Sequence, residues 1–373
     1  MAIRNRFFYF LSVILIIYFF SAAEQRKPHM SRINVLKEKA IMFTIPLNEI
    51  KFGLTYQMDD MGILNDRIPN PIYFNPIAGL FLIDPGKIES PVPNLLRISP
   101  DLHKLFSIDL LKALQISEIQ TPEFLKLTIC GNRTIALLYS LQFNSTTNQY
   151  SECSYAQFDL EGKFIKIIPI PDLKSGKDFI PLEDDQFWYY KNNEAVTGWQ
   201  FYKNNIMLHK VNSTIKNVIC LQDGSLLLLQ EDNKTVCCDI NGNISKIKVI
   251  GNMAKIDAVI QGTGQIFGIL SFTNDAMISD GKDNLLQTMS VQVAYYDLKN
   301  KTVLFFPENP ISSNLFNEND IPKHFEYYNP VMMQFDEKGN FYCISRTGPK
   351  KPELTVYKMM ITNEAQEIIR NKD

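Results

Sequence analysis

The chain of 373 residues is 45% hydrophobic and 12% aromatic, which excludes a disordered protein and leaves two ordinary domains or one repeat architecture. Lys and Arg number 38 against 40 for Asp and Glu, so the formal net charge is only -2. A charge this small gives no general attraction to nucleic acid or to anionic lipid, and we expect neither as a partner.

The amino terminus carries the pattern of an export signal. Arg4 and Arg6 precede an apolar run over residues 7–20, and three small residues follow it before Glu24. This order predicts a signal peptide over residues 1–23, although an uncleaved membrane anchor is the alternative. Residues 24–39 are polar and predict a short tether. We therefore expect an exported protein of the periplasm or cell envelope, which contacts the membrane only if that segment is kept.

An exported protein can form disulfides, so its six cysteines could be either thiols or disulfide-bonded. Six cysteines allow 15 pairings, and the sequence does not choose among them. We expect buried thiols, because a core of this size needs no covalent link, and a disulfide framework is the alternative. The sequence contains no Cys-x-x-Cys pair, and its histidines lie far from one another and from the cysteines. This spacing argues against a metal centre, and we expect no cofactor.

From Ile41 onward the sequence predicts an all-β protein. Segments of five to eight apolar or aromatic residues alternate with clusters of Gly, Asn, Asp and Pro. The exception is a stretch over residues 106–119, which predicts two or three helical turns. One helix does not change the predicted class.

A recurring unit of strand, tight turn and strand predicts the architecture. Asp159, Asp239 and Asp297 occupy the same place in three copies, because Asp can bond the backbone of its own turn. Three residues later stands Gly or Asn, which tolerates a positive φ. Less regular copies begin at residues 95, 199 and 354. A second hairpin precedes each copy, so each unit predicts a four-stranded antiparallel sheet of about 40 residues.

Counting the copies predicts a six-bladed β-propeller over residues 40–373. Its blades are expected near residues 68–112, 124–170, 178–212, 215–250, 254–306 and 325–370. The spare strand-like segment at 40–54 is expected to close the ring by joining the last blade, and an edge strand packed on the first blade is the alternative. The segments FDEKGNFYCIS and FDLEGKFIKII resemble blade motifs of NHL-like and TolB-like six-bladed propellers. The resemblance implies this fold, and relatives include both enzymes and binding scaffolds.

No catalytic constellation is found in the sequence. It contains no Gly-x-Ser-x-Gly turn, phosphate-binding Gly loop or His-Glu-x-x-His helix. A propeller hydrolase of the lactonase or phosphotriesterase kind would need carboxylates around a metal in the central channel. The candidate acids are Asp59, Asp60, Glu183, Asp184 and Asp185. Acidic residues that cluster in turns usually only solvate a loop. We expect a protein that is not an enzyme, with such a hydrolase as the alternative.

Two segments are candidates for binding. The aromatic strands at 186–193 and 199–205 would suit a partner or a sugar ring if their rings are exposed, and the alternative is that they fill the space between blades. The polar insertion at 271–288 is longer than a blade turn requires. We expect a monomeric, non-enzymatic scaffold that binds a protein or an envelope polymer. The candidate binding residues are Trp188, Tyr190, Trp199, Tyr202, Asn274, Asp275, Asp280 and Lys282.

Overall fold

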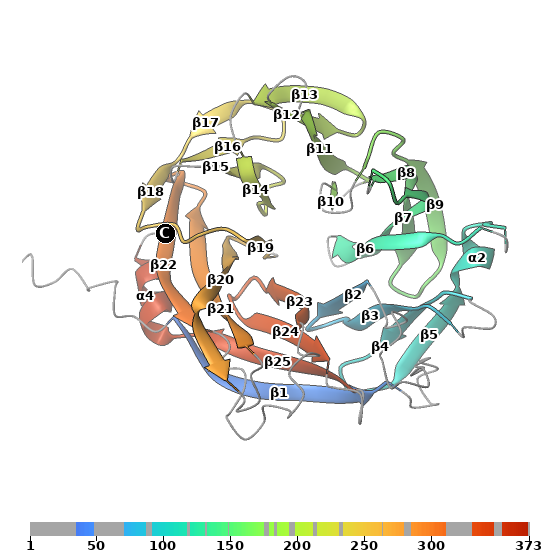
Figure 1. Cartoon of the computed structure of the whole chain (residues 1–373), viewed down its shortest axis with the longest axis horizontal. Coiled ribbons are helices and arrows are strands. Elements are labelled where there is room, and N and C mark those ends of the chain that lie inside the picture. Colours follow the sequence, from blue (N-terminus) through green and yellow to red (C-terminus); the bar gives the residue numbers. More distant parts are fainter. Residues whose placement is uncertain are drawn as a thin grey trace, which may run out of the picture.

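Six small antiparallel sheets stand radially around one axis and form a ring (Figure 1). The chain is seen in a computed structural model. The structure describes residues 35–47, 71–86, 92–117, 120–130, 133–147, 149–174, 179–182, 185–193, 198–211, 215–230, 234–262, 264–279, 285–310, 330–346 and 353–371. The predicted all-β, six-bladed propeller is confirmed.

The first four blades each take four consecutive strands, with the first nearest the axis and the last at the rim (Figure 1). Blade 1 contains β2 (Ile72–Asn75), β3 (Gly79–Asp84), β4 (Asn94–Ile98) and β5 (Lys104–Asp109). Blade 2 contains β6 (Glu123–Cys130), β7 (Thr134–Asn144), β8 (Gln149–Asp159) and β9 (Phe164–Pro169). Blade 3 contains β10 (Phe179–Pro181), β11 (Phe187–Asn193), β12 (Gly198–Lys203) and β13 (Ile206–Val211). Blade 4 contains β14 (Ile215–Cys220), β15 (Leu226–Gln230), β16 (Thr235–Cys238) and β17 (Ile244–Lys246).

Blade 5 has a fifth strand at its rim. Its inner four strands are β19 (Ala258–Ile260), β20 (Ile266–Ser279), β21 (Leu285–Asp297) and β22 (Thr302–Pro310). The link from blade 4 supplies β18 (Lys248–Ile250), which pairs parallel to β22. Ile247 is buried between β17 and β18, so this link fastens the rims of two neighbouring blades together.

The ring closes at blade 6, which combines both ends of the described chain. Its strands are β23 (Pro330–Phe335), β24 (Phe341–Arg346), β25 (Glu353–Ile361) and, at the rim, β1 (Leu36–Pro46). β1 runs antiparallel to β25, from Leu36 opposite Ile361 to Pro46 opposite Glu353. The predicted closure by the amino-terminal strand is confirmed. The strand starts before the expected Ala40, because Val35 and Leu36 are buried in the blade.

Two local predictions need correction. The sixth unit was expected to end in a strand of its own, but helix α4 (Asn363–Arg370) follows β25, because β1 already occupies that edge. The helix predicted over 106–119 is mostly wrong. Strand β5 continues to Asp109, because Phe106 and Ile108 pack in the core between blades 1 and 2. Only the short helix α2 (Leu110–Ala113) follows, capped where the Asp109 carboxylate accepts a bond from the Lys112 amide.

The predicted turn chemistry is present at Asp159 and Asp239, whereas in blade 5 the positive φ lies at Lys301 and not at the expected Asn300. At Asp239, one carboxylate oxygen accepts bonds from the backbone amides of Asn241 at 2.9 Å and Asn243 at 2.8 Å, and Gly242 has a φ of 87°. Asp336 makes the same bonds in blade 6, where Gly339 has a φ of 78°. The turn at Asp239 sets the register of an outer hairpin and the turn at Asp336 that of an inner hairpin. Apolar clusters then fill the space between neighbouring blades.

Candidate binding face and rim pocket

Two hairpins are longer than the blades need. The second strands of blades 1, 3, 4 and 6 have five to seven residues, whereas β7 has 11 and β20 has 14. In blade 2, the ribbon beyond the pair of Ser140 with Cys153 is residues 141–152, which we name the blade-2 arm. The corresponding part of blade 5 is residues 271–289, the blade-5 arm. At about 3.4 Å per residue, the arms extend past their blades by roughly 15 Å and 25 Å.

Both arms leave the ring on the same face. Strands alternate in direction within an antiparallel blade, and every blade has the same order from axis to rim, so all connections between second and third strands share one face. Blades 2 and 5 lie across the ring from each other (Figure 1). The two arms therefore flank one end of the central axis from opposite sides.

The predicted insertion at 271–288 is a paired ribbon. Ser271 lies opposite Ser290 and Thr273 opposite Thr288, and after a register shift Ser279 lies opposite Leu285. Candidates Asn274 and Asp275 lie on β20 in this arm. Candidates Asp280 and Lys282 lie outside the described residues. The backbone placement alone brings Asn274 and Asp275 onto the face with the arms.

The blade-2 arm carries an aromatic pair that sequence reasoning missed. Phe143 and Tyr150 are paired across the ribbon, with ring centroids 4.9 Å apart, and the Phe143 side chain is 42% exposed. Tyr150 packs against the cluster between blades 2 and 3, and its amide donates to the carbonyl of Lys174 at 3.2 Å. Burial, followed by the nearby Glu123 carboxylate, raises the pKa of Tyr150. An aromatic residue at each end of a polar turn was the only sequence signal.

Several other residues of the blade-2 arm form a polar network. The side-chain Nε2 of Gln142 donates to the Glu152 carboxylate at 2.7 Å, and Ser151 Oγ donates to Gln142 Oε1 at 3.3 Å. At the tip, Asn144 Oδ1 accepts bonds from the amides of Thr146 and Thr147. The arm is thus an ordered ribbon with an aromatic pair and a hydrogen-bonded polar network.

The aromatic candidates of blade 3 divide into buried and partly exposed rings. Trp188 is fully buried, and its Nε1 donates to the carbonyl of Gly224 in blade 4 at 2.9 Å. Tyr190 is also buried, 5.5 Å from the Trp199 ring. These two rings fill the space between blades, which was the alternative to binding. Trp199 and Tyr202 keep part of their surface exposed.

Tyr202 belongs to a small stacked group. Its ring lies parallel to that of Tyr189 at 4.7 Å, and the Lys191 ammonium lies 4.8 Å from its centroid. Lys191 also pairs with Asp172 at 3.2 Å, in the link from blade 2. Tyr202 and Tyr150 both pack against the apolar cluster between blades 2 and 3.

Side chains bridge the innermost strands around the axis. Gln261 accepts a bond from the amide of Cys220 and donates to the carbonyl of Val218, both at 3.2 Å. Lys126 Nζ donates to the carbonyl of Phe179 at 2.6 Å, and Gln334 donates to the carbonyl of Phe74. Each bridge joins two neighbouring blades and satisfies a backbone group at an inner strand.

The structure describes only one of the five candidate channel acids, Asp185. Asp59, Asp60, Glu183 and Asp184 lie outside the described residues. Asp185 is exposed and pairs with Lys166, whose hydrogen bond lowers the pKa of Asp185. Within the described ranges, no group of three or more His, Cys, Asp or Glu side chains is placed to hold a metal ion.

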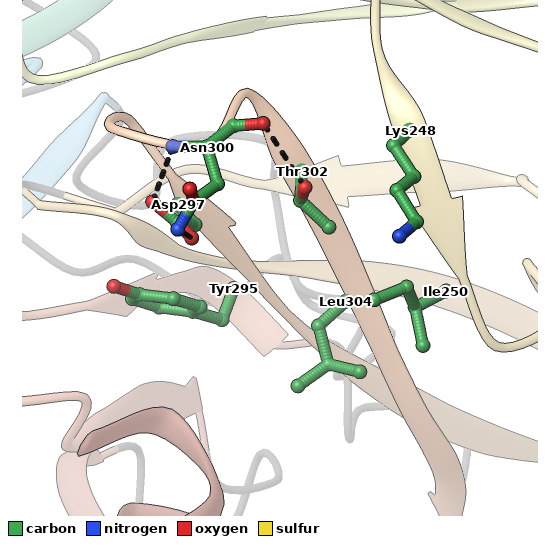
Figure 2. Close-up of a pocket in the computed structure, with 7 residues that line it drawn as sticks. All are labelled: Lys248, Ile250, Tyr295, Asp297, Asn300, Thr302 and Leu304. Carbon is green, nitrogen blue, oxygen red and sulfur yellow. Dashed lines mark hydrogen bonds between the residues drawn. The ribbon is translucent and has the colours of Figure 1, made fainter. Parts of the chain in front are cut away.

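A cavity of about 320 Å³ lies at the rim of blade 5. Figure 2 shows polar groups of Asp297, Asn300, Thr302 and Lys248 around apolar Ile250 and Leu304. Both carboxylate oxygens of Asp297 accept bonds from Asn300, at 2.9 and 2.7 Å. Burial opposes ionisation of Asp297, but these hydrogen bonds outweigh it and lower the pKa. The Asp297 carboxylate therefore stabilises its own turn, which lies far from the axis.

None of the six cysteines forms a disulfide in the structure, and five of them are buried while Cys220 is partly so. Burial raises the pKa of Cys220 and of Cys238 to about 12, and it also raises the pKa of Cys153 and Cys237. These thiols stay protonated at neutral pH, and burial restricts access to most of them.

We expect the native protein to react slowly with a thiol-specific disulfide reagent at pH 8, because little thiolate is present and most of the thiols are covered. After denaturation without reductant, all six should react. The released chromophore, read by absorbance, gives both counts. A count below six in denaturant would show disulfides and contradict the expectation.

No helix in the described part of the chain is long and apolar enough to cross a bilayer.

Comparisons with known proteins find similarity only to solved structures, at low identity. No family model and no curated protein matches the chain. A structure assigned as TolB from Agrobacterium tumefaciens has 11% identity and a TM-score of 0.34, covering 80% of this chain and 92% of that one. One assigned as a 6-phosphogluconolactonase from Bacteroides uniformis has 9% identity and a TM-score of 0.38, covering 76% and 80%. The N-terminal domain of Nup159 has 12% identity and a TM-score of 0.33, covering 78% and 75%.

Proposed function

We propose that this protein is an exported propeller of the cell envelope that binds a protein or an envelope polymer through the face with the two arms, and that it is not an enzyme. The observation that carries the proposal is the position of the arms. They extend from opposite blades on one face, where a partner can contact both arms and the end of the axis between them.

Folding does not account for the arms. Four blades reach a buried core with second strands of five to seven residues. Residues 142–147 of the blade-2 arm are all exposed, so ordering them adds little buried apolar surface. An exposed ribbon of this kind on a rigid scaffold is typical of a recognition element. Among the residues that the structure describes, no group of three or more His, Cys, Asp or Glu side chains is placed to hold the metal that such a hydrolase would need.

Shortening the blade-5 arm tests the proposal. Ser271 and Ser290 are opposite each other, so an Asn-Gly turn can replace residues 272–289 without changing the register below. We expect an unchanged far-UV spectrum and at least a tenfold loss of partner recovered from the organism's own envelope. The matched control is the pair Ile206→Ser and Met207→Ser, exposed side chains on the rim strand β13. Equal recovery by the shortened protein would overturn the proposed face.

Two further measurements address export and catalysis. Amino-terminal sequencing of protein from the periplasmic fraction should begin at Glu24, and a cytosolic, unprocessed chain would contradict export. Purified protein should contain no stoichiometric metal and should not hydrolyse lactones or phosphoesters. Hydrolysis at either class of bond would instead support the hydrolase alternative.

A further inference from the structure

The exposed aromatic ring of the blade-2 arm has no role in the blade core. Phe143 lies beyond the last residues of β7 that pair with β6, and 42% of its side chain remains exposed. Exposing an apolar ring of this size is unfavourable, and a Thr at this place would serve the ribbon equally well. The ring is supported from below by Tyr150, which itself rests on the core between blades 2 and 3. The contact with Tyr150 therefore holds the Phe143 ring in place on the proposed binding face.

The turn beyond this ring carries hydroxyl and amide groups, and the charged side chains of Glu152 and Glu123 lie at the base of the arm. From residue 141 to 151 the sequence contains no charged side chain. Asn144, Ser145, Thr146 and Thr147 are all exposed beside the ring. Near the base of the arm, the Glu123 carboxylate interacts with the phenol of Tyr150 and adds an acceptor. A neutral ligand that carries many hydroxyl groups matches this set of donors and acceptors.

We infer that the aromatic side of the blade-2 arm binds a neutral carbohydrate chain, with a sugar ring stacked on Phe143. This inference rests on the proposed binding role of the same face and names its ligand class. The C–H face of a pyranose is apolar and weakly positive, so it packs on the negative face of an aromatic ring. The hydroxyls at the edge of the sugar then meet the Asn, Ser and Thr side chains of the tip.

A protein partner fits this part of the arm less well. Stable protein interfaces bury about 800 Å² on each side, with an apolar centre and several aromatic anchors. The aromatic surface available on the blade-2 arm is one partly exposed ring with a half-buried second ring below it. This area suits one or two sugar units.

Native gels containing dextran, laminarin or hydroxyethyl cellulose, together with an array of neutral oligosaccharides, test the inference. We expect at least one of these probes to bind the wild-type protein. Phe143→Ala should weaken that binding at least tenfold, whereas Phe143→Trp should retain it, because only the aromatic face is needed. Phe164→Ala is the matched control, since Phe164 is 36% exposed but lies on the rim strand β9.

Two outcomes would overturn the inference. The first is that no neutral glycan among the gels and the array binds the wild-type protein. The second is that Phe143→Ala binds as well as the wild type. If partner recovery depends on the blade-5 arm while no glycan binds, the proposed function stands and only the carbohydrate assignment fails. If glycan binding depends on Phe143 while shortening the blade-5 arm changes nothing, the two-armed face fails instead.

Discussion

Replacing Trp188 by Ala should lower the free energy of unfolding by about 3–5 kcal/mol, as expected for a large buried aromatic side chain. The ring has no exposed surface and packs among residues of blades 3 and 4, so its removal leaves a cavity between the blades. The bond from its Nε1 to the Gly224 carbonyl, at 2.9 Å, is lost as well. Guanidinium chloride unfolding followed by far-UV circular dichroism measures the change.

The second tryptophan provides the control for this experiment. Trp199 lies on the neighbouring strand β12, touches Tyr190 and is partly exposed. We expect Trp199→Ala to cost about 1–2 kcal/mol, because part of its apolar surface already contacts water. Equal losses for the two variants would mean that Trp188 does not fill the space between blades 3 and 4 as described.

The blades could be predicted because their turns are local. Asp239 and Gly242 determine one turn through contacts within five residues, and the same spacing recurs at Asp336 and Gly339. A signal of this kind needs no knowledge of distant parts of the chain. Closure was predictable for a related reason, since an apolar strand before the first unit had no partner of its own.

The failures depend on contacts between blades or on strand pairings that reach beyond a single turn. Residues 106–119 have a helical pattern, but the core between blades 1 and 2 holds Phe106 and Ile108 in a strand. Trp188 and Trp199 look alike in sequence, and only the neighbouring blade decides which of them is covered. Phe143 was missed because its exposure follows from the length of β7 relative to β6, which is a matter of register.

Two isoleucines on β1 can show how much closure of the ring contributes to the free energy of unfolding. Ile45 is fully buried in the cluster between blades 6 and 1, where it packs with Phe43, Phe74 and Val356, whereas Ile41 is 61% exposed. Ile45→Ala should therefore cost about 2–5 kcal/mol, and Ile41→Ala should stay within about 0.5 kcal/mol of the wild type. Guanidinium chloride midpoints compare the two.

Removing β1 entirely should have the larger effect. Without residues up to 47, blade 6 keeps three strands, and the edge of β25 and the cluster shared with blade 1 become exposed to water. Because each blade buries its faces only against its neighbours, an open ring should lose its single cooperative transition and aggregate. A synthetic peptide of residues 35–47 should restore the transition by pairing with β25. A shortened chain that unfolds at the wild-type midpoint would show that the ring holds without this strand.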